Sequence, residues 1–357
     1  MLLDHYGLRE QPFGVTPNPR YLYLSPSHRE ALASLVYGIE SGRGFLALIA
    51  APGMGKTTLL FQFLERLGSR ARTVFLFQAQ SGARGFLRSM MADLGISAEE
   101  DGVALQTRLN QILLQELQAG RKFVLVVDEA QNLDDASLEF VRMLSNFETP
   151  RDKLIHIVLA GQTELAQKLA RPSMIQLRQR ISMLIRLHPL GPAEIAEYID
   201  HRLRVAGYSG SAVFSAAAVS AIASLSGGIP RNINNICFNA LSLGYAGGQR
   251  KIESAIVREV AADLDLSTFS MENAGVLSSL QAAEPAEDTG VRRSRNDSTR
   301  AEGWAVLLDR ILSPGRESGP RAGAASGLGV KESWGQGSRW KETVESLAGR
   351  LRDRMVH

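Results

Sequence analysis

A glycine-rich segment that carries one lysine and two threonines is the part of the sequence best suited to chemistry. Glycines let the backbone curl so that successive N–H groups point at a phosphate, and the start of a following helix adds partial positive charge. Lys56 is placed to reach the β- and γ-phosphates of a nucleotide, and the hydroxyl of Thr57 is placed to ligate Mg²⁺. The pattern predicts a phosphate-binding loop made of Ala51, Pro52, Gly53, Met54, Gly55, Lys56, Thr57 and Thr58.

The residue before this loop departs from the full pattern, which begins with glycine. Ala50 stands at that place. Alanine fits if its φ angle is negative and is strained if it is not. We expect phosphate binding to survive, with at most a slight remodelling of the loop. A glycine turn without a ligand is the alternative, but a loop placed between a predicted strand and a predicted helix favours the phosphate site.

Two neighbouring carboxylates, Asp128 and Glu129, follow the apolar run Phe123–Val127. Carboxylates at the end of a buried strand are costly unless a cation or solvent receives them. Asp128 is placed to hold Mg²⁺ through its water shell, and Glu129 to polarise an attacking water. A strand that simply ends in polar residues is the alternative, and the phosphate loop upstream favours the catalytic interpretation.

Motifs that would indicate other chemistry do not occur. The sequence has no Asn-Lys-x-Asp segment, so we expect adenine rather than guanine in the nucleotide. It has no His-Glu-x-x-His or Gly-x-Ser-x-Gly, and Thr58 stands where a dinucleotide fingerprint needs its third glycine. Cys237 is the only cysteine, which excludes an intrachain disulfide and a cysteine-built metal site. ATP and Mg²⁺ are therefore the expected ligands.

The composition is that of a globular protein in a reducing compartment. Of the 357 residues, 45% are apolar and 22% are charged, and the net charge of +3 is weak evidence for a nucleic-acid partner. No uncharged apolar run reaches the ~18 residues of a membrane-spanning helix, so no transmembrane segment is expected. The first residues also lack the pattern of a secretory signal, and a cytoplasmic location is the default expectation.

Short apolar runs alternate with amphipathic helical patterns in the first part of the chain. Strands that are apolar on both faces are typical of a parallel sheet covered by helices. One helix is predicted over Pro26–Ser41, with Ser25 as its cap, and another over Lys56–Leu67. The predicted strands are Phe45–Ala50, Thr73–Gln78, Phe123–Val127, Leu154–Ala160 and Ser182–Leu187.

After Leu190 only helical patterns follow, at about 191–206, 212–226, 230–246 and 252–263. We therefore expect an α/β nucleotide-binding domain over 1–190, which includes an N-terminal segment 1–44, and a helical lid over 191–265. Residues 266–357 are rich in glycine, serine, arginine and glutamate, so a mostly disordered tail is expected there. Two short amphipathic helices are predicted in this tail, around Trp304–Leu312 and Trp340–Leu351; docking to a partner or an anionic membrane is the alternative to marginal helices.

Further motifs occur in order along residues 1–265 and resemble those of AAA+ ATPases, most closely the general secretion pathway protein A (ExeA-type) family. The resemblance implies a P-loop NTPase (AAA+) fold, with a parallel sheet, helices on both of its faces and an all-helical lid. Many of these relatives continue into a transmembrane helix and a peptidoglycan-binding domain, neither of which is expected in this sequence. The motifs that carry the resemblance are Tyr6–Phe13, Thr16–Tyr23, Tyr37–Ile39, Asp128–Leu133, Gly161–Leu165, Gln179–Ile181 and Gly228–Arg231.

The resemblance also implies roles for single residues. Gln162 would be a polar sensor between the acidic pair and the γ-phosphate, and Arg231 the sensor arginine of the lid. Arg180 or Arg178, with Arg180 preferred, would enter a neighbour's site as an arginine finger. The alternatives are an ordinary loop glutamine for Gln162, a surface arginine at a helix N-terminus for Arg231, and solvated or ion-paired side chains for the other two arginines. The aromatic segment Tyr6–Phe13 would pack either near the adenine or in a core.

These inferences predict an ATP hydrolase that drives or switches the assembly of an envelope-associated machine for secretion, pilus formation or polysaccharide export. An arginine supplied in trans implies a homo-oligomer, with an unidentified envelope or secretion partner. The protein is expected in the cytoplasm, with peripheral attachment at the inner face of the membrane as a variant. The alternative function is an ATP-dependent DNA-binding regulator of the transposition type, against which the small net charge argues.

Overall fold

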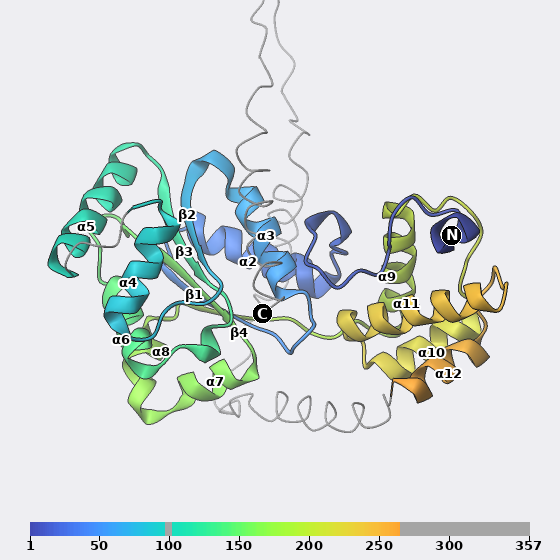
Figure 1. The fold of residues 1–357 in the computed structure, drawn as a ribbon. Helices are drawn as coiled ribbons and strands as arrows, with labels where there is room; N and C mark the ends of the chain where they lie inside the picture. Colours follow the sequence, from blue (N-terminus) through green and yellow to red (C-terminus); the bar gives the residue numbers. More distant parts are fainter. Residues whose placement is uncertain (97–101, 265–357) are drawn as a thin grey trace, which may run out of the picture. The chain divides into compact units, whose positions relative to one another are not determined.

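A five-stranded, all-parallel sheet is the centre of the computed structural model, which describes residues 1–96 and 102–264. The strand order is β2-β3-β4-β1-β5 (Figure 1). The parallel sheet expected from the apolar runs is confirmed, although β2 lies two residues earlier than its predicted start. The strands are β1 (Phe45–Ile49), β2 (Ala71–Leu76), β3 (Lys122–Val127), β4 (His156–Gly161) and β5 (Met183–Arg186).

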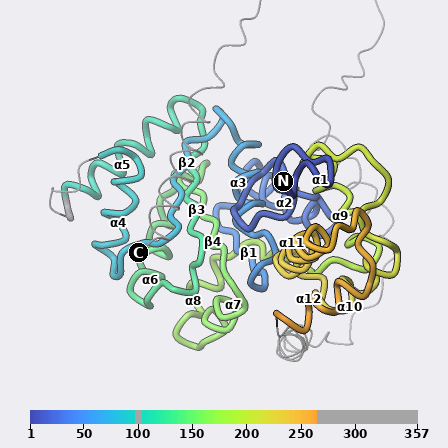
Figure 2. Tube along the Cα trace, turned by 45° about the vertical axis from the view of Figure 1, so that its right-hand side comes forward, coloured from blue at the N-terminus to red at the C-terminus, as the bar shows by residue number. Residues whose placement is uncertain are grey.

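Alternation along each strand divides the sheet's apolar side chains between two separate cores. On one face, Leu46 and Val126 pack with α2 (Pro26–Glu40) and α3 (Lys56–Leu67). On the other face, Phe45 and Leu125 pack with five helices, and Figures 1 and 2 show the helices on both sides of the sheet. These five are α4 (Gly82–Asp93), α5 (Gly102–Gln118), α6 (Asp135–Leu144), α7 (Thr163–Ala170) and α8 (Ile175–Arg180).

The strand order brings three chain segments to one edge of the sheet. β4 lies between β1 and β3, so the segments that follow these strands are neighbours although they are about 35 to 110 residues apart in sequence. The carboxyl ends of parallel strands are where such folds place their ligands. The glycine loop after β1, the acidic pair after β3 and Gln162 after β4 therefore meet at this edge.

Four helices after the sheet form a third apolar core. The glycine pair Gly227–Gly228 separates two of them, and Ser215 accepts a hydrogen bond from the Ala218 N–H to cap the first of these two. The N-terminal helix α1 (Leu2–Tyr6) also packs on this group, as Figures 1 and 2 both show. The four are α9 (Pro192–Val205), α10 (Ala216–Ser226), α11 (Pro230–Ala246) and α12 (Ser254–Asp263).

The sequence predicted no transmembrane segment and a mostly disordered tail over residues 266–357. Within the described residues, every helix is too short or too polar to cross a bilayer. Residues 266–357, with both predicted amphipathic helices, lie outside the described residues.

Candidate active site

The glycine loop adopts the curled backbone that a phosphate requires. Gly53 and Gly55 have φ angles of +79° and +83°, in the left-handed region that only glycine enters without strain, and Gly55 leads directly into α3. Ala50 is not strained, because Glu129 is the only non-glycine residue with positive φ in the described part of the chain. The alanine that replaces the first glycine of the pattern therefore fits the loop as it stands.

Lys56 and Thr57, at the start of α3, face the acidic pair at the end of β3. The Lys56 ammonium lies 3.2 Å from Asp128 Oδ1 and 2.7 Å from Glu129 Oε1. Thr57 Oγ1 donates a hydrogen bond to Asp128 Oδ2 at 2.6 Å. Lys56 and Asp128 are both buried, so each compensates a charge that would otherwise be costly. The structure thus brings together four side chains from two stretches that are more than 70 residues apart.

Glu129 is held by three side-chain donors. Besides Lys56, Gln131 Nε2 donates to its Oε2 at 2.5 Å and Gln162 Nε2 donates to the same oxygen at 2.9 Å. Burial alone would raise the pKa of Glu129, but these hydrogen bonds and the Lys56 charge outweigh burial and lower it. Its φ of +52° is a conformation that costs about 1 kcal/mol or more for a residue with a Cβ. Strained backbone of this kind is frequent at functional sites.

Gln131 connects two of the predicted site residues, although the sequence analysis gave it no role. Its side-chain oxygen accepts a hydrogen bond from the backbone N–H of Gln162 at 3.1 Å, while its nitrogen donates to Glu129. The Lys168 ammonium donates to the carbonyl oxygens of Gln131 and Leu133, which fixes the loop after β3. The signs of this role in the sequence were the position of Gln131, two residues after the catalytic candidate, and its place in the motif Asp128–Leu133.

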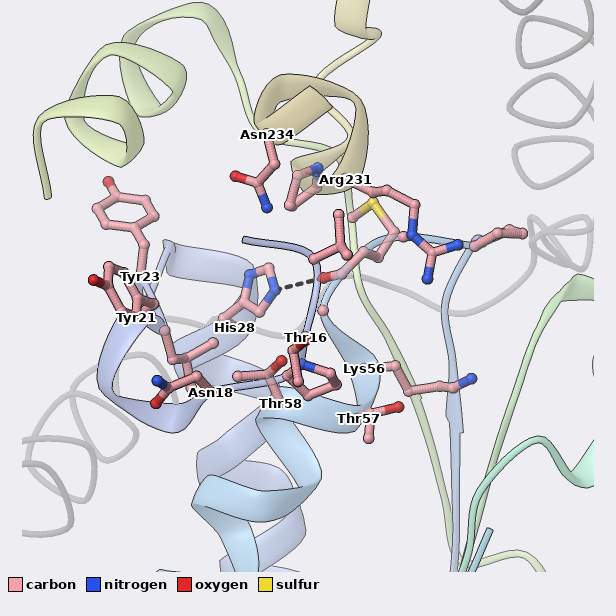
Figure 3. Close-up of a pocket in the computed structure, with 18 of the residues that line it drawn as sticks. Thr16, Asn18, Tyr21, Tyr23, His28, Lys56, Thr57, Thr58, Arg231 and Asn234 are labelled. Atoms are coloured by element: carbon pink, nitrogen blue, oxygen red, sulfur yellow. Dashed lines mark hydrogen bonds between the residues drawn. The ribbon is translucent and has the colours of Figure 1, made fainter. Parts of the chain in front are cut away.

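Arg231 brings the helical domain to the glycine loop. Its backbone N–H donates to the Gly53 carbonyl oxygen at 3.1 Å, at the start of α11. A Cβ on Gly53 would lie 2.7 Å from the Arg231 Cβ, so only glycine permits this approach. The Arg231 side chain is exposed and lines a cavity (Figure 3). Gln162 and Glu129 line the same cavity.

Arg178 and Arg180 lie apart from this cavity. Both are exposed on α8, which precedes the amino end of β5, whereas the cavity opens at the carboxyl ends of the strands. Neither arginine lines the cavity of its own chain. Their assignment as a finger for a neighbouring subunit stays a prediction.

His28 is a buried residue of the site to which no role was assigned from the sequence. Its Nε2 lies 3.0 Å from the Met54 carbonyl oxygen in the glycine loop (Figure 3). Its Nδ1 lies 2.8 Å from the Ser25 hydroxyl at the start of α2. Burial lowers the pKa of His28, which favours the neutral ring. In this form Nε2–H donates to Met54 and Nδ1 accepts from Ser25, so the imidazole joins α2 to the loop.

The N-terminal segment contributes to the cavity, but not through the residues considered first. Tyr6 and Phe13 are buried in the core of the helical domain, so core packing is the correct interpretation for these two aromatic side chains. The residues that follow them line the cavity instead. These are Gly14, Val15, Thr16, Pro17, Asn18, Tyr21, Leu22 and Tyr23.

The residues at the carboxyl edge fit a hydrated magnesium ion. Mg²⁺ prefers oxygen ligands, keeps several waters and is usually held in nucleotide sites by one or two protein groups together with phosphate oxygens. Thr57 and Asp128 offer a hydroxyl and a carboxylate whose oxygens lie 2.6 Å apart. Within the described residues there is no cluster of three histidine, cysteine, aspartate or glutamate side chains that would hold a metal on its own.

Comparisons with known proteins relate the sequence to one domain family and to a secretion-pathway protein. The AAA domain family matches residues 39–169. General secretion pathway protein A from Aeromonas hydrophila is 38% identical over 273 residues, which cover 76% of this chain and 48% of the relative, so the chain spans about half the length of that protein.

Two solved structures share the fold at low sequence identity. Cdc6p from Pyrobaculum aerophilum has a TM-score of 0.55 at 19% identity, with 71% of this chain and 70% of that chain covered. The ORC2 protein of Aeropyrum pernix, solved in ADPNP–ADP complexes, has a TM-score of 0.54 at 14% identity, with 84% and 89% covered. The chain is thus an AAA+ protein with a P-loop fold, similar in sequence to General secretion pathway protein A.

Proposed function

We propose that this protein binds and hydrolyses Mg·ATP and uses the energy to drive or switch the assembly of an envelope-associated machine. The observation that carries the proposal is the convergence of Lys56, Thr57, Asp128, Glu129 and Gln162 at one edge of the sheet. A lysine, a hydroxyl and two carboxylates beside a glycine loop are what phosphoryl transfer requires.

The chain's own residues would perform the reaction as follows. Backbone N–H groups of the loop 51–55 and the Lys56 ammonium bind the β- and γ-phosphates, and Lys56 exchanges its contacts with the acidic pair for the phosphate. Thr57 and Asp128 would hold Mg²⁺, which would supply positive charge beside the phosphates. Glu129 orients the attacking water and accepts its proton, and Gln162 contacts the γ-phosphate.

Two arginines complete the proposed site. Arg231 lies where the helical domain approaches the loop, which supports a role in binding the γ-phosphate of a nucleotide held by its own chain. Arg180 is exposed and does not line that cavity, and we propose that it reaches the site of a neighbouring subunit, as would Arg178 if it took this role. A homo-oligomer follows from this proposal, and a finger of this type contributes about 10³- to 10⁵-fold in rate.

The proposed pathway is supported by the 38% identity to General secretion pathway protein A. Cytoplasmic residence, with or without attachment to the inner face of the membrane, follows from the same proposal. The DNA-regulator function has no specific support among the site residues.

The proposal is tested by titrating a fluorescent ATP analogue into wild type and Lys56→Ala and by measuring phosphate release over a range of protein concentrations. We expect Mg²⁺-dependent binding that Lys56→Ala weakens, and turnover per chain that rises with concentration. Indifference to adenine nucleotides would refute the proposal. Retardation of duplex DNA that weakens steeply with salt would favour the regulator instead.

A further inference from the structure

The cavity extends beyond the phosphate-binding loop along one face of α11. Arg231 and Asn234 both line it, and residues three apart on a helix share a face about 4.5 Å apart along the axis. Arg231 is the one that contacts the loop at Gly53. Asn234 therefore lies one turn farther from the phosphates, where Tyr21, Tyr23 and Tyr198 line the cavity and a nucleotide base would be placed.

A buried hydrogen-bond chain fixes the orientation of the Asn234 side chain. Arg202 Nη1 donates to the Tyr198 hydroxyl oxygen at 3.0 Å. An arginine can only donate, so that oxygen must accept, and its own proton is free for another partner. Tyr198 gives this proton to Asn234 Oδ1 at 2.9 Å. The amide must then present its oxygen to Tyr198 and its NH₂ group to the other side.

Arg202 is itself held firmly enough to impose this order. Its Nε donates to the Pro12 carbonyl oxygen at 2.6 Å and its Nη2 to the Gly14 carbonyl oxygen at 3.3 Å. The guanidinium also lies over the Tyr21 ring, 4.8 Å from its centre. Arg202, Tyr198 and Asn234 are all at least 92% buried, so their polar atoms have little access to water outside the cavity.

The amide nitrogen of Asn234 points into the cavity. Figure 3 shows it directed toward the space that His28 and Tyr23 also border. In the described part of the chain this nitrogen has no hydrogen-bond partner, although the oxygen of the same amide is bonded to Tyr198. The nitrogen is therefore a free donor at the cavity wall, where a ligand that accepts a hydrogen bond would replace water.

We propose that Asn234 is a specificity-determining residue that donates a hydrogen bond from Nδ2 to the ring nitrogen N1 of adenine. This inference rests on the proposed function and identifies how the base is selected. In adenine N1 is an acceptor, whereas in guanine and hypoxanthine it carries a hydrogen. The fixed amide therefore rejects these two bases, because two donors would face each other.

The decisive variants change the amide without removing its bond to Tyr198. Asn234→Asp keeps an oxygen for the Tyr198 proton and replaces the donor with an acceptor. Asn234→Ala removes both groups. Asn235→Ala is the matched control, because it lies on the same helix and does not line the cavity. Each variant is titrated with ATP, GTP, inosine triphosphate and tripolyphosphate, and the thermal midpoint is measured to establish folding.

We expect wild type and Asn235→Ala to favour ATP over both N1–H nucleotides. Asn234→Ala should reduce that preference about 3- to 10-fold, the value of one hydrogen bond. Asn234→Asp should shift the ratio about 10-fold or more toward GTP and inosine triphosphate. Repulsion between the new carboxylate and the phosphates weakens all ligands alike and cancels in the ratio, as does any loss of folded protein.

Two results would overturn the inference. One is an unchanged ratio in Asn234→Asp. The other is an equal loss for ATP and tripolyphosphate in Asn234→Ala, which would place Asn234 at the phosphates. Either result leaves the proposed function intact if wild type binds ATP. A wild type that binds no adenine nucleotide would instead refute the proposed function itself.

Discussion

Replacing Glu129 with glutamine should separate ATP binding from ATP hydrolysis. Glutamine keeps an oxygen that accepts from Gln131 and Gln162, so the loop after β3 retains its hydrogen bonds. It cannot accept the proton of an attacking water. A general base contributes about 10²- to 10⁴-fold, so turnover should fall by that factor.

The same substitution should strengthen ATP binding. Lys56 is paired with Glu129 at 2.7 Å, and ATP must take Lys56 away from this partner. A hydrogen bond between charged groups contributes about 1.5–3 kcal/mol. The Glu129 side chain is 22% exposed, and solvent reduces this to about 1–2 kcal/mol, or about 5- to 30-fold in affinity. Asp128 remains as a second partner of Lys56, so we expect a gain in ATP affinity near the lower limit of this range.

The assay pairs a fluorescent-nucleotide titration with phosphate release under single-turnover conditions. Glu139→Gln is the matched control, because Glu139 is an exposed glutamate that forms an ion pair with Arg142 outside the cavity. Turnover of Glu129→Gln at the wild-type rate would show that another group activates the water. A tenfold weaker ATP affinity would show that the Lys56–Glu129 pair does not oppose binding.

Three further predictions concern other parts of the molecule. His28→Ala should raise the Kd for ATP about 3- to 10-fold with little change in kcat, because the Met54 carbonyl loses its donor; His28→Gln should restore affinity, and equal losses in both variants would contradict this. Burial and two nearby lysines lower the pKa of His156 to about 4, so an unfolded chain binds a proton below about pH 6.5 that the folded chain does not. Stability should fall by about 2 kcal/mol between about pH 7.5 and pH 5 in urea unfolding, and His156→Leu should lose that share of the pH dependence. Arg180→Ala should be inactive alone yet regain turnover when mixed with Glu129→Gln, because a Glu129→Gln subunit would supply Arg180 to the intact site of its neighbour. No recovery, or recovery with Arg178→Ala instead, would show that Arg180 is not the arginine finger.

Local pattern was sufficient for the elements and for the chemistry of the loop. Apolar runs and glycine spacing depend on nearest neighbours in sequence, which is why all five strands and the helix that begins at Lys56 were predictable. The acidic pair was recognisable because two carboxylates at the end of a buried strand need a cation. Sequence also predicted the AAA+ fold, through motifs that occur in order.

Contacts between distant segments were decided only by the tertiary structure. Gln131 meets Gln162 because β3 and β4 are neighbours in the sheet, and no local pattern encodes that strand order. His28 becomes part of the loop's support because α2 packs beside α3, and Asn234 acquires a fixed orientation through Tyr198 and Arg202 on another helix. The three hydrogen bonds, His28–Met54, Gln131–Gln162 and Tyr198–Asn234, join residues 26 to 36 positions apart in the sequence. A hydrogen bond over such a separation exists only once packing has brought both groups together.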